Sequence, residues 1–198
     1  MFKKTILLSA VVALFSVSAV AKGHQGGKYG SFESEDRGFS SNRATQMDSS
    51  SITDITDEQK KELLYMVEEE KLARDVYAYL YEMWGSSVFE KIVKSEQRHM
   101  DSMKSLADKY ELETPSTLDV RGEFENEELQ AQYNTLIEKG KQSLVDALEV
   151  GVTIEETDIA DLERILEEDT PKDFAKKYQN LLKGSFNHLK AFNSQLGR

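Results

Sequence analysis

The chain has 198 residues, of which 39% are apolar and 31% are charged, so it can bury one ordinary hydrophobic core but hardly two. Its 36 acidic and 25 basic side chains give a net charge of −11, which argues against nucleic acid and anionic membrane surfaces as partners. Because cysteine is absent, disulfides, thiol catalysis and sulfur-ligated metal centres are excluded. Any metal ion must therefore be held by oxygen and nitrogen ligands.

The first 21 residues are typical of a secretory signal peptide. Lys3 and Lys4 precede an apolar stretch from Ile6 to Ser18, and an Ala-x-Ala site ends at Ala21. This stretch is shorter than the run of about 20 apolar residues that a membrane span needs. We therefore expect cleavage after Ala21, a periplasmic or secreted protein, and no membrane partner after cleavage.

Residues 22–55 differ in composition from the rest of the chain. Gly and Ser make up 12 of these 34 residues, and the apolar residues follow no period. Such a segment cannot bury enough apolar surface to offset the entropy of ordering it. We expect a flexible Gly/Ser-rich tail here and one folded domain over residues 56–198.

Four long helices are predicted in this domain, at about 57–84, 88–110, 141–168 and 171–196. A shorter helix is expected near 126–139, in the connection between the second and third. Thr56 with Gln59 forms one capping-box pattern, Ser87 with Glu90 forms another, and Pro171 is expected at a first helical position. No strand-like alternation is present, so the sequence predicts an all-α four-helix bundle with a short extra helix.

Each long helix has one stripe of core positions that is apolar at both ends and polar in the middle. Helices of about 26 residues are about 39 Å long, and their midpoints meet at one level whichever way each helix runs. We therefore expect the polar side chains of these stripes to converge inside the bundle. They are Glu70, Glu96, His99, Glu155, Asp158 and His188.

Carboxylates and imidazoles in this arrangement favour a metal centre. Two carboxylates at about 5 Å repel by about 3 kcal/mol at an effective dielectric constant of about 20. Two divalent cations would cancel four negative charges, and neutral imidazoles would fill the remaining positions. The pattern thus predicts a dinuclear site of iron or manganese. The alternative is a hydrogen-bonded polar network in which some carboxylates are protonated.

Several neighbouring residues are assigned other roles. Glu68 and Glu69 are expected at a solvated edge. Glu69 is nevertheless the alternative ligand if Glu70 does not bind, and Glu156 is the alternative to Glu155. Arg74 and Asp75 flank the stripe and are candidates for pairing with neighbours. Tyr77 and Trp84 are expected to be core aromatic residues rather than redox groups.

These residues resemble the ligand motifs of the ferritin-like superfamily over about Thr56 to Leu196. Glu70, with Ala three and Tyr seven positions later, is similar to the first-helix ligand segment of rubrerythrins and bacterioferritins. Glu96 with His99 matches the second-helix Glu-x-x-His of the superfamily, and Glu155 matches the third-helix Glu. Asp158 falls where rubrerythrins have a further carboxylate.

Longer strings resemble the exported ferritin-like family known as domain of unknown function 2202. They span residues 68–77, 95–100, 155–162 and 184–189. The resemblance implies a ferritin-like four-helix bundle with two iron (or manganese) ions. One position departs from the superfamily pattern, because Ser185 stands where the fourth helix usually has a ligand Glu. Either Asp158 substitutes for that ligand, or the second ion is weak or absent.

Three functions remain open on the sequence. The first is oxidation of Fe(II) or reduction of peroxide or dioxygen at a dinuclear site. There Glu70 and His99 would hold one ion, Glu155 or Asp158 would hold the other with His188, and Glu96 would bridge. The second is non-catalytic metal binding at a degenerate site, and the third is an envelope interaction protein. A redox-active protein would need an external electron donor, and a homodimer stays open.

Overall fold

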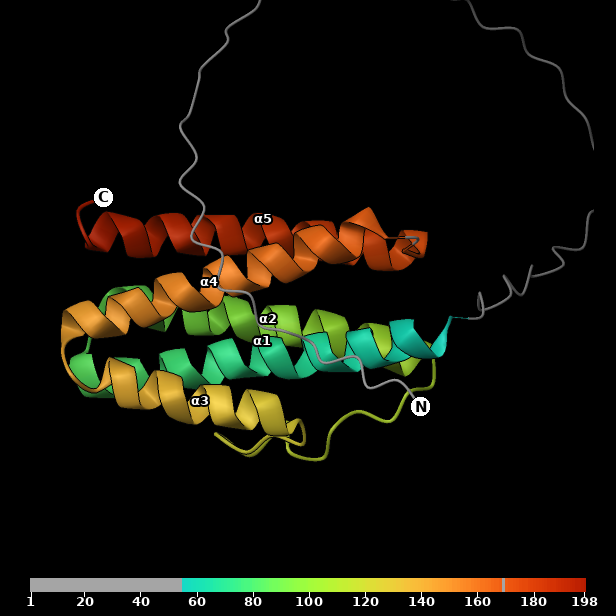
Figure 1. Cartoon of the computed structure of the whole chain (residues 1–198), viewed down its shortest axis with the longest axis horizontal. Coiled ribbons are helices and arrows are strands. Elements are labelled where there is room, and N and C mark those ends of the chain that lie inside the picture. Colours follow the sequence, from blue (N-terminus) through green and yellow to red (C-terminus); the bar gives the residue numbers. More distant parts are fainter. Residues whose placement is uncertain (1–54, 169) are drawn as a thin grey trace, which may run out of the picture. The chain divides into compact units, whose positions relative to one another are not determined.

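The computed structural model describes residues 55–168 and 170–198, which form five helices and no strand (Figure 1). The all-α prediction is therefore confirmed. The helices are α1 (Asp57–Trp84), α2 (Ser87–Lys109), α3 (Glu127–Gly140), α4 (Leu144–Glu167) and α5 (Lys172–Gln195). The expected signal peptide and all but the last residue of the expected tail lie outside the described residues. Within the described residues, every helix is too short or too polar to cross a bilayer.

The four long helices form a bundle built from two pairs. Helix α1 packs along α2, and α4 packs along α5. Contacts of α2 with α5 and of α1 with α4 join the two pairs, and α3 packs on both α1 and α4 (Figure 1). Helix α1 therefore contacts three other helices, which are α2, α3 and α4.

The helix boundaries follow the predicted local signals with three exceptions. The capping box at Thr56 is present, since its side chain accepts the N–H of Gln59 and Gln59 Oε1 accepts the N–H of Thr56. Gly85 ends α1 in the left-handed conformation, at φ 64°. The second capping box is wrong, because α2 begins at Ser87 itself and Ser86 is the N-cap residue, without a capping side-chain bond.

The other exceptions concern α4 and α5. Helix α4 starts three residues later than expected because the Ser143 side chain caps it by accepting the N–H of Asp146. Pro171 is the N-cap of α5 rather than its first helical residue, so α5 begins at Lys172. Neither difference changes which residues face the core.

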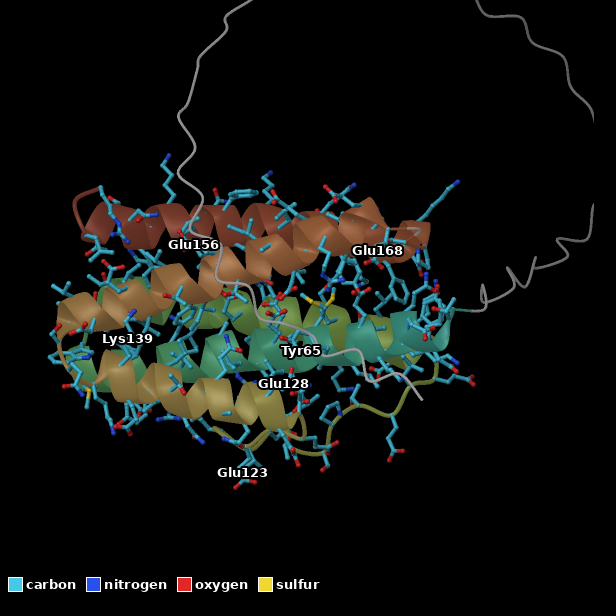
Figure 2. The ribbon with its side chains drawn as sticks, viewed as in Figure 1. Tyr65, Glu123, Glu128, Lys139, Glu156 and Glu168 are labelled. Atoms are coloured by element: carbon cyan, nitrogen blue, oxygen red, sulfur yellow. The ribbon has the colours of Figure 1, made fainter. Side chains whose placement is uncertain are left out.

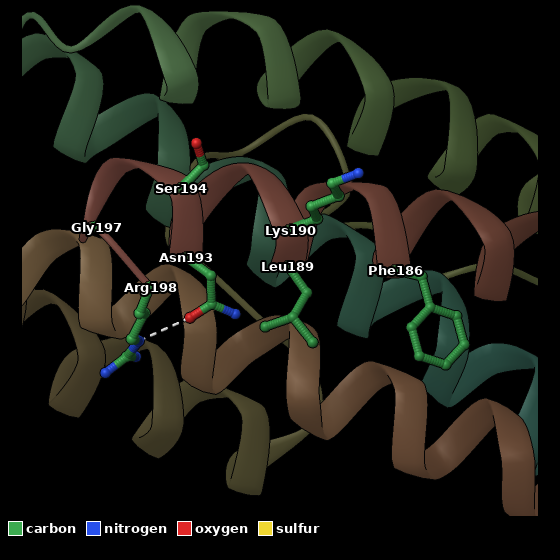
Figure 3. A pocket seen from close by; sticks show the side chains of 7 residues that line it. All are labelled: Phe186, Leu189, Lys190, Asn193, Ser194, Gly197 and Arg198. Carbon is green, nitrogen blue, oxygen red and sulfur yellow. Dashed lines mark hydrogen bonds between the residues drawn. The ribbon is translucent and has the colours of Figure 1, made fainter. Parts of the chain in front are cut away.

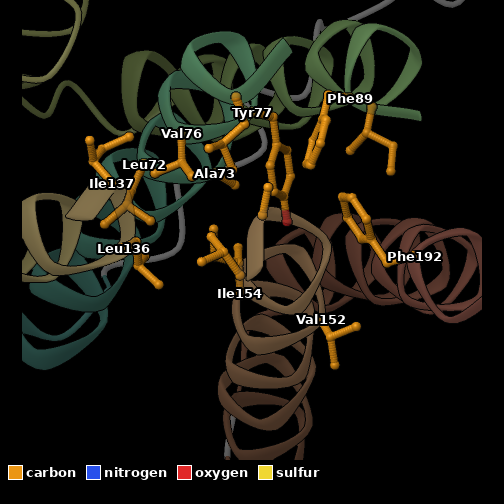
Figure 4. Close-up of a cluster of buried hydrophobic side chains, with 14 of the residues drawn as sticks. Leu72, Ala73, Val76, Tyr77, Phe89, Leu136, Ile137, Val152, Ile154 and Phe192 are labelled. Atoms are coloured by element: carbon orange, nitrogen blue, oxygen red, sulfur yellow. The ribbon is translucent and has the colours of Figure 1, made fainter. Parts of the chain in front are cut away.

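The core consists of two apolar clusters, one toward each end of the bundle. One cluster surrounds Tyr77, Phe89 and Phe192, whose rings contact one another with centroids 5.2–6.1 Å apart (Figure 4). The other includes Met66, Met103, Leu162 and Phe174, together with Ile55, which the sequence placed in the tail. The sequence also predicts Leu144 as a core position of its helix, but this residue is exposed.

A network of buried charges ties α1 to the loop before α3. Lys71 is fully buried and donates to Asp75 Oδ2 at 2.6 Å and to the backbone carbonyl of Glu123 at 2.9 Å. Its ammonium group also lies 4.0 Å from the ring centroid of Phe124. The Glu123 side chain itself is exposed (Figure 2).

Glu68 belongs to the same attachment, so its expected position at a solvated edge is wrong. Its carboxylate is buried and accepts the backbone N–H groups of Glu125 at 2.7 Å and Asn126 at 3.0 Å. These N–H groups lie at the start of α3, where an anion is favourable. Both oxygens of Glu68 are therefore engaged.

Candidate metal centre

Glu96 lies between the two imidazoles of the folded region. Its Oε2 atom is 2.8 Å from His99 Nδ1, and its Oε1 atom is 2.7 Å from His188 Nδ1. The two rings stack with centroids 5.5 Å apart, and one ligand atom from each of the three residues lies within 4.8 Å of the others. Helices α2 and α5 thus bring together three of the predicted site residues as a group that could hold a metal ion.

Two further carboxylates face these imidazoles from the other helices. Glu70 Oε2 on α1 lies 3.3 Å from His99 Nδ1, and Glu155 Oε2 on α4 lies 3.5 Å from His188 Nδ1. The hydroxyl of Tyr77, which points toward α4, donates to Glu155 Oε1 at 2.7 Å (Figure 4). Tyr77 is a fully buried core residue, as expected, and it also orients a carboxylate of the centre.

Asp158 completes the predicted set and is fixed by the residue that replaces the expected fourth-helix Glu. The buried Ser185 hydroxyl donates a short hydrogen bond to Asp158 Oδ2. A serine cannot supply the missing charge, but here it orients a carboxylate from the adjacent helix. All six predicted site residues therefore meet at one level of the bundle.

Five carboxylates from three helices line a cavity of about 10 Å³ at this level. That volume accommodates about one water-sized particle. Ala73 and Ile154 complete the wall, and the acidic residues are Glu69, Glu70, Glu96, Glu155 and Asp158. The expectation that Glu69 lies at a solvated edge is thus wrong, since its side chain is only 6% exposed.

The burial of Glu69 could not be read from one helical stripe. The presence of three consecutive Glu residues in the middle of α1 was the available signal, together with the position of Glu69 100° round the helix from Glu70. Contacts of α1 with α2, α3 and α4 bury a wider arc than one stripe. By contrast, the other alternative ligand, Glu156, is exposed on α4 and takes no part in the centre (Figure 2).

Many polar atoms of the centre have no hydrogen-bond partner despite their close approach. Buried atoms of this kind occur on all four long helices, although buried polar groups are nearly always paired in proteins. They are Glu69 Oε2, Glu70 Oε1, Glu96 Oε1, His99 Nδ1, Asp158 Oδ1 and His188 Nδ1. Such convergence of lone-pair donors is what a cation site requires.

The imidazoles and Glu96 influence each other's protonation strongly. Burial by itself lowers the pKa of His99, but the carboxylates of Glu70 and Glu96 outweigh it and raise the pKa to about 11. For His188, Glu155 and Glu96 likewise outweigh burial and raise the pKa to about 10. Burial raises the pKa of Glu96, yet the two facing imidazoles lower it to about 2.

The remaining carboxylates are shifted in the opposite direction. Burial, with repulsion from Glu96, raises the pKa of Glu155 to about 8. Burial also raises the pKa of Asp158 to about 7, although the Ser185 hydrogen bond opposes the rise. For Glu69 and Glu70, burial and the charge of Asp158 raise the pKa well above its ordinary value. Without a cation, protons must therefore neutralise part of this cluster.

The flanking residues Arg74 and Asp75 pair with neighbours, as predicted. Arg74 donates to Asp75 Oδ1 and Gln97 Oε1, each at 2.8 Å, and to the carbonyl of Leu118 at 3.0 Å. This guanidinium therefore links α1, α2 and the loop after α2. It holds the two helices that carry Glu70 and Glu96 in register.

A larger, shallow hollow lies on the surface near the C-terminal end of α5 (Figure 3). Its volume is about 730 Å³, and its walls include Phe186, Leu189 and Arg198, whose guanidinium donates to Asn193. None of its seven lining residues is Asp, Glu, His or Cys. The hollow thus has none of the side chains that gather in the candidate metal centre.

The chain is similar to known proteins in sequence and in structure. The family model described as "Uncharacterized protein domain (DUF2202)" matches residues 59–198. "Uncharacterized protein MJ0754" of Methanocaldococcus jannaschii is 49% identical over 138 residues, which are 70% of this chain and 75% of that protein. The crystal structure of hypothetical protein MJ0754 is similar with a TM-score of 0.71 at 47% identity, covering 73% of this chain and 82% of that one. The chain belongs to the DUF2202 family.

Proposed function

We propose that this protein holds a pair of metal ions, iron or manganese, on the carboxylates and imidazoles inside the bundle. The pair would serve to oxidise Fe(II) or to reduce peroxide or dioxygen. The observation that carries the proposal is the convergence of Glu96, His99 and His188 inside the bundle, where each offers one ligand atom within 4.8 Å of the others. Glu96 lies 2.7–2.8 Å from both Nδ1 atoms, so an ion that binds here would replace protons on the imidazoles.

The ligand set fits these metals. Imidazole nitrogen and carboxylate oxygen are ligands that iron and manganese accept, and the chain has no cysteine to favour a softer ion. When bound, two Fe(II) ions supply two electrons, which reduce one hydrogen peroxide to two water molecules with uptake of two protons. Since the chain offers no thiol redox centre, we also propose that an external donor returns the electrons.

Each protein group has a definite part in this proposal. Glu96, His99 and His188 would hold one ion, since the two oxygens of Glu96 face different imidazoles, and the carboxylates that line the adjoining cavity would hold the other. Tyr77 keeps Glu155 oriented through its hydrogen bond. The apolar clusters on either side of the centre exclude bulk water.

Electrostatics also supports cation binding. Five buried carboxylates line one small cavity, and each pair at about 5 Å repels by about 3 kcal/mol at an effective dielectric constant of about 20. Protons or cations must offset this repulsion. Because metal binding requires neutral imidazoles and ionised carboxylates, it should release protons and strengthen as the pH rises.

Metal analysis after anaerobic loading with Fe(II) or Mn(II) tests the proposal. The wild-type protein should retain bound ions after desalting, and Glu96→Gln should retain fewer than about 0.3 ions per chain. Glu90→Gln is the matched control, because Glu90 lies on the same helix and pairs with Lys94 at 3.1 Å, away from the centre. Wild-type protein that binds no metal, or a Glu96→Gln variant that binds as well as wild type, would refute the proposal.

A metal-binding protein without turnover is the second candidate, and the small volume of the cavity favours it. Stopped-flow absorbance separates the two. A redox enzyme loaded with Fe(II) should develop ferric absorbance within seconds of mixing with peroxide, whereas a binding protein should not. We further propose that either activity takes place in the periplasm or outside the cell, because the first 21 residues have the pattern of an export signal.

A further inference from the structure

The unpartnered oxygens of the centre divide into two neighbouring groups. One group surrounds the imidazoles and is formed by Glu96, His99 and His188. The other consists of carboxylate oxygens alone, namely Glu69 Oε2, Glu70 Oε1 and Asp158 Oδ1. Glu96 of the first group and all three residues of the second line the same cavity, and only the first group contains nitrogen ligands.

Glu70 connects the two groups. Its Oε2 atom faces His99 Nδ1 at 3.3 Å, while its Oε1 atom is buried and has no partner. Glu70 lines the same cavity as Glu69 and Asp158, whose free oxygens complete the second group. One carboxylate is thus placed to contact two adjacent cations.

Glu69 and Asp158 each contribute one free oxygen to this second group. Asp158 Oδ2 accepts the hydrogen bond of Ser185, which leaves Oδ1 unpartnered. Glu69 is only 6% exposed, lines the cavity and has an unpartnered Oε2. Its buried neighbour Glu68 differs, because both oxygens of Glu68 accept backbone N–H groups.

We propose that Glu69 is a metal ligand and that, with Asp158 and Glu70, it forms an all-carboxylate position for the second cation beside the histidine-containing position. This inference rests on the proposed function and names the group that replaces the ligand lost at Ser185. The replacement comes from α1, beside Glu70, rather than from α5. An all-oxygen position selects harder cations such as Mn(II) over ions that prefer nitrogen.

The charge of the cluster supports a second cation. With neutral imidazoles and five ionised carboxylates, one divalent ion leaves a net charge of −3, and two leave −1. Glu69 also has a carboxylate neighbour outside the cavity, Asp161, which is half-buried. No Lys or Arg lines the cavity to neutralise Glu69.

Loading with Mn(II) tests the assignment without relying on activity. Wild-type protein, Glu69→Gln, Asp158→Asn and Glu156→Gln are saturated with Mn(II) anaerobically, desalted, and analysed for metal content and by electron paramagnetic resonance. Glu156→Gln is the matched control, because Glu156 is the exposed neighbour of Glu155 just as Glu69 is the buried neighbour of Glu70. Circular dichroism checks that each variant is folded.

We expect two Mn(II) per chain with a spin-coupled spectrum for wild type and Glu156→Gln. For Glu69→Gln and Asp158→Asn we expect one Mn(II) with the six-line spectrum of an isolated ion. Two ions in Glu69→Gln with unchanged affinity would overturn the inference, as would loss of both ions from the folded variant. One ion in wild type, unaffected by Glu69→Gln, would overturn it and leave metal binding intact. No ion in wild type would overturn the proposed function as well.

A second measurement covers a variant that does not fold. Crystals of the wild-type protein soaked in Mn(II) are used for an anomalous difference map at the manganese edge. The inference requires two peaks, one of them within about 2.5 Å of a Glu69 carboxylate oxygen. A map without a peak beside Glu69 overturns it.

Discussion

Gly184 on α5 lies directly against the imidazole of His99 on α2. A Cβ atom at residue 184 would come within 2.6 Å of both Nε2 and Cε1 of that ring. The absence of a side chain here lets the ring fit between the helices, with Nδ1 directed at Glu70 and Glu96. A glycine in mid-helix therefore determines where a candidate ligand lies.

The substitution Gly184→Ala should weaken metal binding without unfolding the bundle. The overlap forces the ring of His99 to move, while alanine favours the helix by about 1 kcal/mol over glycine. We expect the dissociation constant for Mn(II) to rise by about 10-fold or more, in the range seen when groups that orient ligands are lost. Isothermal titration calorimetry measures it, and Lys183→Ala, at an exposed position of the same helix, is the control. Unchanged affinity in Gly184→Ala would show that the ring can relocate freely.

Removing the Tyr77 hydroxyl should reduce both stability and metal affinity. Tyr77→Phe leaves Glu155 Oε1 without its donor in a buried site, which costs about 1–3 kcal/mol. Urea unfolding of the metal-free protein measures the free energy of unfolding. Tyr178→Phe is the matched control, because the Tyr178 hydroxyl is buried and has no hydrogen-bond partner. Its removal should leave the free energy of unfolding unchanged or increase it. Equal effects of the two substitutions would contradict the role of the Tyr77 hydrogen bond.

The metal-free protein should become less stable as the pH rises from 5 to 8. The folded-state pKa values of Asp158, about 7, and Glu155, about 8, lie above their ordinary values, so the native state keeps protons that the unfolded chain releases. The raised pKa values of His99 and His188 act in the same direction above pH 6.5. The lowered pKa of Glu96 acts only below pH 4.5.

Thermal unfolding in a chelating buffer measures this pH dependence. Asp158→Asn should flatten the curve between pH 4 and 7, because the group that binds the extra proton is gone. Added Mn(II) should reverse the slope, since the cation replaces the protons and binds more tightly at higher pH. If the melting temperature of the metal-free protein rose from pH 5 to 8 in the chelating buffer, the raised pKa values of Asp158 and Glu155 would be contradicted.

The buried ammonium of Lys71 should be essential to the fold. Lys71→Met leaves Asp75 buried with only part of its charge compensated and removes the bond to the Glu123 carbonyl, so we expect a loss of about 3 kcal/mol. Lys60→Met removes an exposed pair with Asp57 and should cost less than about 1 kcal/mol. Chemical denaturation of both variants gives the comparison. Similar small losses would mean that Arg74 alone can hold Asp75.

Helix boundaries and the level of the polar centre could be predicted from the sequence because both depend on local rules. The cap at Thr56, the turn at Gly85 and the 3.6-residue period require only residues near in the chain. The same period placed Glu96 and His99 on one face of α2. Where two local signals competed, as at Ser86 and Ser87, the choice of cap was wrong by one residue.

The tertiary structure alone decided which residues beside the stripes are buried. Glu68, Glu69 and Lys71 lie on faces of α1 that a single stripe assigns to solvent, yet α3, its preceding loop and α4 cover those faces. Burial depends on partners far away in the chain, and periodicity within one helix carries no information about them. The sequence by itself thus determined that acidic and imidazole side chains share one level of an all-α bundle. Which oxygens remain free, and that Glu69 is one of the residues that supply them, followed only from the packing of α1 against its neighbours.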